Sequence, residues 1–365
     1  MPASAELDRE MMGRCLQLAQ RARGKTAPNP LVGCVIVQGE TVVGEGFHPG
    51  PGQPHAEIFA LTAAGEQARG ATLYVNLEPC CHYGRTPPCT EAILAAGLAR
   101  VVVGLVDPDP RVSGGGHAQL QAAGLAVTVG VEEAACRPLN EAFIHRSRYQ
   151  RPFGLLKYAM TLDGKIAAST GHSAWITSEK ARQRVYEQRA AADAVIIGGN
   201  TVRRDNPRLT THGLSDRNPL RVVMSRKLDL PVTANLWHTE AVSTLVFTEM
   251  GANLPLQRLL MQRGVEVVEL PALEPAAVMA NLYDRGFMQV MWECGGLLAA
   301  RAIADGAVQK VMAFIAPKII GGLGAPTPVG DLGLKSMTEA LRLEGATCQV
   351  IAPDFLIEGY LPVHA

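Results

Sequence analysis

The stretch EPCCHYGRTPPC, residues 78–89, follows an apolar run and carries three of the eight cysteines of the chain. Upstream, His55-Ala56-Glu57 follows a loop rich in glycine and proline and opens a helical pattern. One imidazole and two thiolates, from His55, Cys80 and Cys89, can hold a zinc ion and leave its fourth tetrahedral position open to water. Helix N-termini lower the pKa of thiols and so favour the thiolates that a metal requires. The two segments therefore predict a metal centre where helices begin.

Glu57 stands two residues after the histidine, within reach of a metal-bound water. Zinc lowers the pKa of such a water to about 7, so that hydroxide is available at neutral pH. Attack of hydroxide on an amino-bearing ring carbon requires a group that takes one proton and delivers it to the leaving ammonia, a role that suits Glu57. H-x-E followed by P-C and a second cysteine is the signature of zinc-dependent nucleobase deaminases. We therefore expect a zinc-dependent nucleobase deaminase domain over residues 1–147.

A closed, structural zinc site is the alternative. The two cysteine ligands are separated by eight residues, whereas the usual deaminase spacing is C-x-x-C. Structural sites have four protein ligands, and Cys81 or His82 could supply the fourth. The residues alone leave this alternative open.

Strand and helix patterns alternate around the metal motif. The expected helices cover 8–23, 56–64 and a segment from 87–88 to 96, and the expected strands cover 32–37, 41–46, 72–76, 101–106 and 125–129. The first two strands form a hairpin around Gly39. This alternation is typical of an α/β layered unit with a central sheet.

A polar segment at 144–152 ends in proline and is expected to be a linker. A second αβ pattern follows, with strand candidates at 153–159, 194–197, 220–224, 244–247, 265–269, 289–292, 308–315 and 355–360. We therefore expect two α/β domains, 1–147 and 148–365, without internal repeats.

Composition narrows the class of protein. The 365 residues, 47% hydrophobic and 19% charged, are enough for two globular domains. Lys plus Arg equals Asp plus Glu at 34 each, so the basic excess of proteins that bind nucleic-acid backbones is missing. The N-terminus has no apolar run of the signal-peptide type, and no stretch reaches the roughly 20 apolar residues of a membrane span. We expect a cytoplasmic protein with reduced cysteines that binds neither nucleic acid nor a membrane.

Two glycine turns follow strand patterns in the C-terminal half. Glu293-Cys294-Gly295-Gly296 follows one strand and Gly198-Gly199-Asn200-Thr201 another, each before a helical pattern. Backbone amides at such turns cradle phosphates. Ser225-Arg226-Lys227, after a third strand, suits the ribose 2′-phosphate of NADP better than the diol of NAD. A solvated basic turn is the alternative for this last segment.

Five motifs, NPLVGCVIV (29–37), GFH (46–48), HAE (55–57), EPCCHYGRTPPC (78–89) and DPDP (107–110), resemble the deaminase half of the bifunctional riboflavin-biosynthesis deaminase/reductase family. The resemblance covers nearly the whole chain. It implies a cytidine-deaminase-like αβα domain and, as substrate, a pyrimidine that carries a ribosylamino phosphate. It also implies that four side chains line the pyrimidine and phosphate pocket: Asn29, His48, His82 and Arg85.

Segments 157–167, 173–178, 198–210 and 293–296 resemble the reductase half of the same family, which has a dihydrofolate-reductase-like α/β domain and uses NADPH. The resemblance implies NADPH contacts from residues spread over the domain: Ala159, Trp175, Thr201, Asp205, Ser225, Gly295, Gly296, Leu297, Leu298, Ala299, Ala300 and Arg301. It implies substrate contacts from Lys157, Ser173, Arg189, Leu209, His212 and Glu293. The implied reaction is hydride transfer to C1′ of the opened ribose, which gives a ribityl side chain. Lys157 or Asp205 could assist ring opening and proton delivery, and the sequence does not decide between them.

Three positions depart from the family pattern: Cys81 stands where serine is common, Asp109 where asparagine is usual and His212 where arginine is common. The change at His212 makes one substrate phosphate contact weaker or pH-dependent. Enzymes of the family are commonly dimers or tetramers, so we expect a homo-oligomer.

The leading hypothesis is a bifunctional enzyme of riboflavin biosynthesis, a zinc-dependent aminohydrolase and an NADPH-dependent reductase in one chain. The second hypothesis is a deaminase of free nucleosides or tRNA with an unrelated C-terminal domain, against which the neutral charge and the GRTPPC insertion argue. The third is a non-catalytic, zinc-stabilised binding protein, in which Glu57 would have no use.

Overall fold

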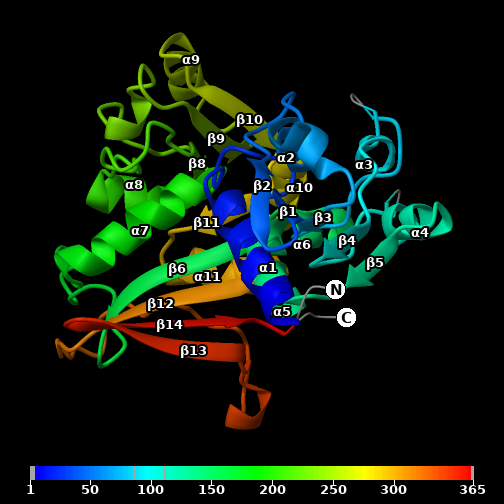
Figure 1. Ribbon diagram of the computed structural model, residues 1–365. Coiled ribbons are helices and arrows are strands. Elements are labelled where there is room, and N and C mark those ends of the chain that lie inside the picture. Colours follow the sequence, from blue (N-terminus) through cyan, green and yellow to red (C-terminus); the bar gives the residue numbers. More distant parts are fainter. Residues whose placement is uncertain (1–4, 85–86, 111, 363–365) are drawn as a thin grey trace. The chain divides into compact units, whose positions relative to one another are not determined.

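The computed structural model describes residues 5–84, 87–110 and 112–362. The chain divides into two compact units, Met1–Gln150 and Arg151–Ala365, called unit 1 and unit 2 below (Figure 1). The predicted boundary after residue 147 lies inside α6 (Glu141–Tyr149), the last helix of unit 1. Every helix in the described ranges is too short or too polar to span a bilayer.

Unit 1 has, within its described residues, a five-stranded sheet in the order β2-β1-β3-β4-β5. The strands are β1 (Gly33–Gln38), β2 (Thr41–Phe47), β3 (Thr72–Val75), β4 (Arg100–Val103) and β5 (Ala126–Val129). β1 pairs antiparallel with β2 and β3, whereas β3, β4 and β5 are parallel. The segments that follow β3 and β4 therefore leave the sheet at the same edge.

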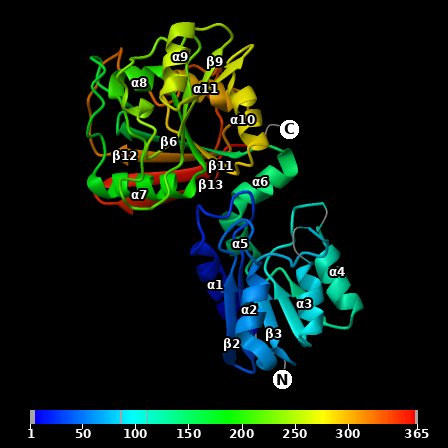
Figure 2. The ribbon, with the colours of Figure 1, turned by 90° about the horizontal axis from the view of Figure 1, so that it is seen from above.

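Helices cover both faces of this sheet: α1 (Ala5–Gln20), α5 (Glu133–Leu139) and α6 on one, and α2 (Ala56–Ala64), α3 (Cys89–Ala95) and α4 (Gly115–Ala122) on the other (Figure 2). Successive strand side chains point to opposite faces. Val35 of β1 accordingly packs in the cluster of α1, and Ile36 packs in the cluster of α2. The αβα layering that the sequence predicts is present.

Two glycines of β2 set the distance between α2 and the sheet. A Cβ atom at Gly46 would lie 2.4 Å from the carbonyl oxygen of Ala56, and one at Gly44 would lie 2.3 Å from that of Ala60. Such contacts are far shorter than van der Waals distances, so only glycine allows this close packing. The first turn of α2 is thereby held directly against the strand.

A buried ion pair fixes α1 on the opposite face. Arg100 of β4 donates to both carboxylate oxygens of Asp8, at 2.8 and 2.7 Å, and the Tyr74 hydroxyl of β3 donates to the same carboxylate at 3.0 Å. Asp8 is only 6% exposed. A buried carboxylate without these donors would strongly destabilise the fold, so Asp8 requires both Arg100 and Tyr74.

Unit 2 has, in the described part of the chain, a nine-stranded sheet in the order β10-β9-β8-β7-β11-β6-β12-β14-β13. The strands are β6 (Phe153–Thr161), β7 (Ala194–Gly198), β8 (Leu220–Met224), β9 (Thr244–Glu249), β10 (Glu266–Leu270), β11 (Gln289–Trp292), β12 (Lys310–Ala316), β13 (Glu344–Ile351) and β14 (Asp354–Tyr360). The strands from β10 to β12 in this order are parallel, and β14 is antiparallel to both of its neighbours.

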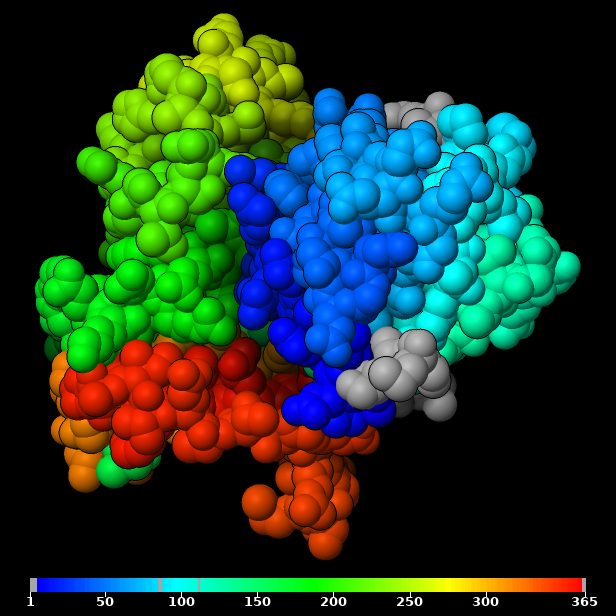
Figure 3. Space-filling view, viewed as in Figure 1, coloured from blue at the N-terminus to red at the C-terminus, as the bar shows by residue number. Residues whose placement is uncertain are grey.

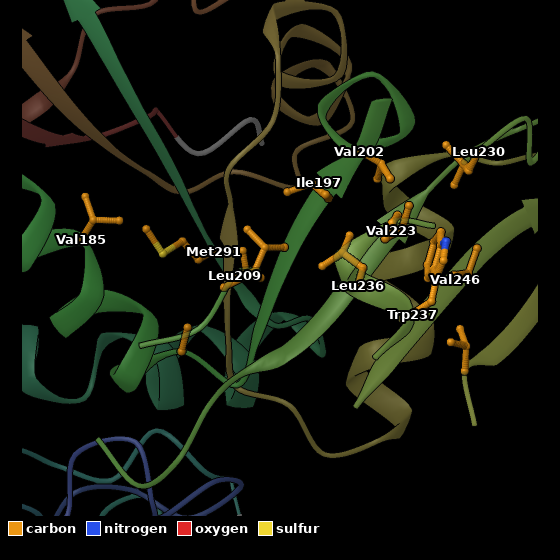
Figure 4. Packing of buried hydrophobic residues seen from close by; sticks show 14 of the residues in the cluster. Val185, Ile197, Val202, Leu209, Val223, Leu230, Leu236, Trp237, Val246 and Met291 are labelled. Atoms are coloured by element: carbon orange, nitrogen blue, oxygen red, sulfur yellow. The ribbon is translucent and has the colours of Figure 1, made fainter. Parts of the chain in front are cut away.

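This sheet is also covered on both faces, so unit 2 is the second layered α/β domain that the sequence predicts. One face carries α7 (Glu179–Ala191), α8 (Gly199–Asp205) and α9 (Leu254–Gln262), and the other carries α10 (Pro275–Asp284) and α11 (Gly296–Ala304). Figure 4 shows the first of these cores, where Ile197, Val223 and Val246 of three neighbouring strands pack with Trp237. Parallel strands buried on both faces explain the continuous apolar runs in the sequence.

The boundary between the two units, after Gln150, falls inside the predicted linker at 144–152, although residues 144–149 of that segment are the end of α6. Ile144 is 9% exposed and packs in the apolar cluster of α1 and β1, and the partly buried Phe143 packs against the same cluster, so two neighbouring apolar residues hold a helix whose other residues are mostly polar.

The sequence also did not predict β13. All of its side chains except Ile351 are exposed, so it lacks the apolar alternation that reveals a strand. Pairing with β14 forms it, and the surface of these C-terminal strands faces the viewer in orange-red to red in Figure 3.

Replacement of Asp8 by alanine is expected to destabilise unit 1 by about 2–3 kcal/mol, because it leaves the Arg100 guanidinium partly buried without its carboxylate. Thermal unfolding of D8A followed by circular dichroism measures this effect. Glu10→Ala is the control, since Glu10 is an exposed acid on the same helix. Equal unfolding temperatures of the two variants would show that the buried pair does not fix α1.

Candidate active sites

The three predicted metal ligands of unit 1 lie together. The Nδ1 atom of His55 lies 3.2 Å from Sγ of Cys89 and 3.5 Å from Sγ of Cys80, and the ligand atoms all lie within 4.8 Å of one another. His55 precedes α2, Cys89 opens α3 and Cys80 lies on the segment after β3. One nitrogen and two sulfurs at this spacing fit zinc, whose bonds to such atoms measure about 2.0–2.3 Å.

Hydrogen bonds within the group favour a thiolate at Cys80. The Cys89 side chain has the largest effect in lowering the pKa of Cys80, and His55 and the Cys89 backbone amide, 3.3 Å from the sulfur, act in the same direction. Thiolates are the form of cysteine that binds metals. The donor set therefore suits a zinc ion chemically as well as geometrically.

Glu57 lies in the first turn of α2, is 3% exposed and shares a hydrogen bond with the Cys89 side chain. Burial raises the pKa of Glu57 above its ordinary value. A raised pKa makes a carboxylate a stronger base and so favours the uptake of a proton. The acid thus lies directly beside the ligand group, with the property that proton transfer requires.

Asn29 and His48 form one polar unit next to the ligands. Nδ2 of Asn29 lies 3.0 Å from Nε2 of His48, whose Nδ1 lies 3.0 Å from the carbonyl oxygen of Pro54. The His48 ring stands edge-on to that of His55, with centroids 5.6 Å apart. Burial lowers the pKa of His48, so it is neutral at pH 7 and can donate to Pro54 while accepting from Asn29.

No fourth His, Cys, Asp or Glu joins the ligand group among the residues that the structure describes. Cys81 points toward the Val112 carbonyl instead, at 4.0 Å. Nδ1 of His82 is buried without a hydrogen-bond partner in the described ranges, and Arg85 lies outside them. The arrangement favours an open site over the closed structural one.

In unit 2 a buried carboxylate joins two of the predicted substrate contacts. Arg189 donates to Glu293 from Nε at 2.6 Å and from Nη2 at 3.0 Å, and Nζ of Lys157 lies 3.6 Å from the same carboxylate. Although burial acts in the other direction, Arg189 and Lys157 lower the pKa of Glu293 to about 2. Burial lowers the pKa of Lys157. Two cations and one anion leave a net positive cluster that suits an anionic substrate.

Ser173 and Trp175 lie on the loop before α7, and Asp205 is the last residue of α8. The Ser173 hydroxyl donates to Asp205 at 2.9 Å. The Trp175 ring is 71% exposed, with the Arg182 guanidinium 4.6 Å from its centroid, and the Trp175 carbonyl accepts from Nζ of Lys318 at 2.7 Å. A cation holds one aromatic ring in place, and the ring remains accessible for stacking.

Three predicted contacts have a left-handed backbone: Trp175 with φ 61°, Leu209 with φ 54° and His212 with φ 52°. Each costs about 1–3 kcal/mol for a residue other than glycine, and such residues concentrate at functional sites. The Leu209 side chain, however, is 3% exposed and belongs to the core, so a substrate could meet only its backbone. His212 stacks on Tyr186 at 4.3 Å, and burial lowers the pKa of His212, so it is neutral at pH 7.

The two glycine turns lie side by side, because β7 and β11 are neighbouring parallel strands. The first leads into α8, which carries Thr201, and the second leads into α11. Ser225, after β8, approaches so closely that a Cβ at Gly199 would lie 3.1 Å from its hydroxyl. A Cβ at Gly295 would meet nothing within 4 Å, which leaves room for a ligand against the backbone. Adjacent turns of this kind suit the phosphates of a dinucleotide.

The side chains of several predicted cofactor residues already pack in the core or form ion pairs within the protein. Ala299 is fully buried in the core, Ala300 is 6% exposed and Ala159 packs against the other core cluster. Arg301 pairs with Glu274 at 3.0 Å and with Asp305. Leu297, by contrast, is 81% exposed and Leu298 partly so. The cofactor contacts of these positions stay predictions.

The sequence missed three side chains of the second site. Arg182 and Tyr186 share one face of α7 with Arg189, and their i, i+4, i+7 spacing is a signal that could have revealed them. Lys318 comes from a distant loop, and no local pattern marks it.

Comparison with known proteins agrees with both sites. Residues 5–105 match the cytidine and deoxycytidylate deaminase zinc-binding region, and residues 152–357 match the RibD C-terminal domain. The riboflavin biosynthesis protein RibD of Synechocystis is 62% identical over 97% of this chain and 96% of its own, and that of Aquifex aeolicus is 41% identical over 96% and 98%. A C-terminal domain unrelated to reductases, as in the nucleoside or tRNA deaminase hypothesis, is therefore wrong.

Solved structures show the same similarity. Acinetobacter baumannii RibD superposes with a TM-score of 0.87 at 36% identity over 98% of this chain and 100% of that chain. A diaminohydroxyphosphoribosylaminopyrimidine deaminase/5-amino-6-(5-phosphoribosylamino)uracil reductase from Thermotoga maritima superposes with a TM-score of 0.87 at 35% identity over 98% and 99%. Both units of this chain are thus similar to the units of these enzymes.

Replacement of Cys80 by alanine is expected to remove bound zinc, because two ligands cannot hold the ion as three do. Cys81→Ala and His82→Ala are the matched controls and are expected to keep one zinc per chain. Elemental analysis of the purified variants by mass spectrometry measures this difference. Loss of zinc from either control would identify a fourth ligand and a closed site.

Proposed function

The chain belongs to the family of bifunctional riboflavin-biosynthesis deaminase/reductases, and from this premise we propose its substrates and the role of each side chain. Unit 1 removes the amino group from the ring of a pyrimidine that carries a ribosylamino phosphate. Unit 2 then reduces the ribosyl side chain to ribityl with NADPH. The two activities of the Thermotoga maritima relative, a deaminase and a reductase of the corresponding uracil, support this order of substrates. The single observation that carries the proposal is the carboxyl group of Glu57 beside His55, Cys80 and Cys89.

In unit 1, His55, Cys80 and Cys89 would hold zinc, which when bound activates water as a nucleophile at neutral pH. Glu57 takes the proton of the attacking water and delivers it to the leaving ammonia. Its burial beside the ligands supports this role, because the raised pKa makes both steps accessible. Asn29 and His48 fix the pyrimidine edge, and His82 and Arg85 contact the remaining part of the substrate.

In unit 2, the adjacent glycine turns, Thr201 and Ser225 would hold NADPH, which supplies the hydride when bound. The exposed cations Arg226 and Lys227 after β8 fit its 2′-phosphate. Trp175 and Asp205 complete the cofactor contacts. The open space beside Gly295 and the exposed Trp175 ring support this placement.

We assign the proton that completes reduction to Lys157. Its ammonium group carries a proton, lies in the buried cluster with Glu293 and Arg189, and has a pKa lowered by burial, which eases release. Asp205 already accepts from Ser173, so this pair serves to orient the opened sugar. The predicted cytoplasmic location and the dimer or tetramer stay predictions.

Replacement of Glu57 by glutamine is expected to lower the rate of ammonia release on the order of 10²–10⁴-fold, because the amide cannot shuttle a proton. Oxidation of NADPH with the deaminated substrate is expected to stay at the unmodified rate. Separate assays of ammonia and of NADPH absorbance test this. Simultaneous loss of both activities would contradict two independent sites.

Replacement of Lys157 by alanine is expected to slow reduction by a similar factor and to spare deamination. Lys335→Ala is the control, since Lys335 is exposed and lies outside the proposed site. Single-turnover oxidation of NADPH measures the effect. Unchanged reduction by K157A would remove Lys157 from the mechanism and leave Asp205 as the proton source.

A further inference from the structure

We propose that Glu78 is a positioning residue of the deaminase site, whose buried carboxylate holds the segment after β4 against the turn that carries the ligand Cys80. This inference deepens the proposed function and rests on it. Glu78 follows β3, is 3% exposed and stands two residues before Cys80. It has no part in the chemistry assigned above, although its charge is fully buried.

The carboxylate accepts hydrogen bonds from both ends of one segment. Oε2 accepts from the backbone amides of Asp107 at 3.1 Å and Gly114 at 3.0 Å. Oε1 accepts from the amide of His117 at 3.0 Å, and Nδ1 of the same histidine lies 2.9 Å away. Four donors from Asp107, Gly114 and His117 therefore converge on a single side chain. A carboxylate is the side chain that accepts this many bonds without offering a donor.

The same segment packs directly on the ligand turn. A Cβ at Gly116 would lie 2.1 Å from the carbonyl oxygen of Pro79, and one at Gly115 would lie 2.9 Å from Sγ of Cys81. Both distances are far below van der Waals contact, so the start of α4 touches the backbone next to Cys80. Asp107 is close enough to Cys80 for their charges to interact. The start of α4 thus lies against the turn that carries the metal ligand, and hydrogen bonds to Glu78 hold it in this position.

Parallel pairing explains why this arrangement arises. β3 and β4 are adjacent and parallel, so Glu78 after β3 and Asp107 after β4 leave the sheet at the same edge. The amide of Glu78 itself donates to the Leu105 carbonyl at 2.9 Å, which fixes the two segments in register. The carboxylate then extends this pairing beyond the strands. A loop without such an anchor would be free to move away from the site.

Replacement by glutamine is the sharpest test, because it preserves the shape of the side chain. One oxygen becomes an NH2 group, which faces two N–H donors instead of accepting from them. The segment 107–117 is then expected to loosen while the metal ligands remain. Glu66→Gln is the matched control, since Glu66 is exposed. His117→Ala removes one partner of Oε1, the imidazole Nδ1 atom, and keeps the backbone amide, so it is expected to act in the same direction to a smaller extent.

We expect E78Q to keep one zinc per chain, the visible spectrum of the cobalt-substituted enzyme and the reductase rate. Its kcat/KM for deamination is expected to fall on the order of 10- to 100-fold, mostly through KM, since a misplacement of about 1 Å costs this much. Hydrogen exchange of the amides in 107–117 is expected to accelerate. The reductase rate and zinc content show that E78Q is folded.

Deamination at the unmodified rate by zinc-loaded E78Q would overturn the proposal. A loss of zinc in proportion to the loss of activity would also overturn it, because Glu78 would then act only by keeping the metal bound. Absence of deamination by the unmodified enzyme would instead refute the proposed function. Hydrogen exchange separates the two failures, because it reports the state of 107–117 without any substrate.

Discussion

For unit 1 to hold a metal, the ligand atoms of three side chains from separate elements must lie within 4.8 Å of one another. The packing of the helices and strands of this unit brings them together. His55 comes from the start of α2, and two glycines of β2 let that helix approach the sheet. Cys80 comes from the end of β3, where parallel pairing with β4 fixes the backbone. Cys89 comes from the start of α3. Because each ligand stands at the end of an element rather than within one, packing of the αβα layers, not local conformation, sets their distances.

Packing also brings side chains from separate elements together at the second site, where opposite charges rather than a metal link them. Glu293 follows β11, Lys157 lies on the neighbouring β6, and Arg189 reaches them from α7. A carboxylate with 9% exposure is tolerated because two cations compensate its lost hydration. The glycine turns after β7 and β11 lie at the same edge for the same topological reason, since ligands of α/β sheets bind beyond the carboxyl ends of parallel strands. In both units, residues of the candidate site thus lie on short segments that follow the ends of parallel strands.

Sequence patterns predicted the strands of both sheets well where apolar residues run continuously, and failed where they do not, as in β13. The ligands and Glu57 could be predicted because one fixed motif carries them and their chemistry admits few other roles. The Arg189–Glu293–Lys157 cluster could be named only by resemblance, since its members come from three distant segments. Glu78 lies in the motif that carries the two cysteine ligands. Its role could not be predicted from the sequence, because it depends on where tertiary packing places the segment after β4. The helix α6 was missed because its core contacts come from two adjacent residues, Phe143 and Ile144, which show no helical periodicity.

The central claim is that the ion in unit 1 has three protein ligands and one position open to water. X-ray absorption at the zinc edge of the purified enzyme tests this most directly, because it counts sulfur and nitrogen or oxygen neighbours around the ion. We expect two sulfur ligands, one imidazole nitrogen and one further light atom whose distance changes when substrate is added. A third sulfur, a second imidazole, or a coordination shell that does not respond to substrate would contradict it.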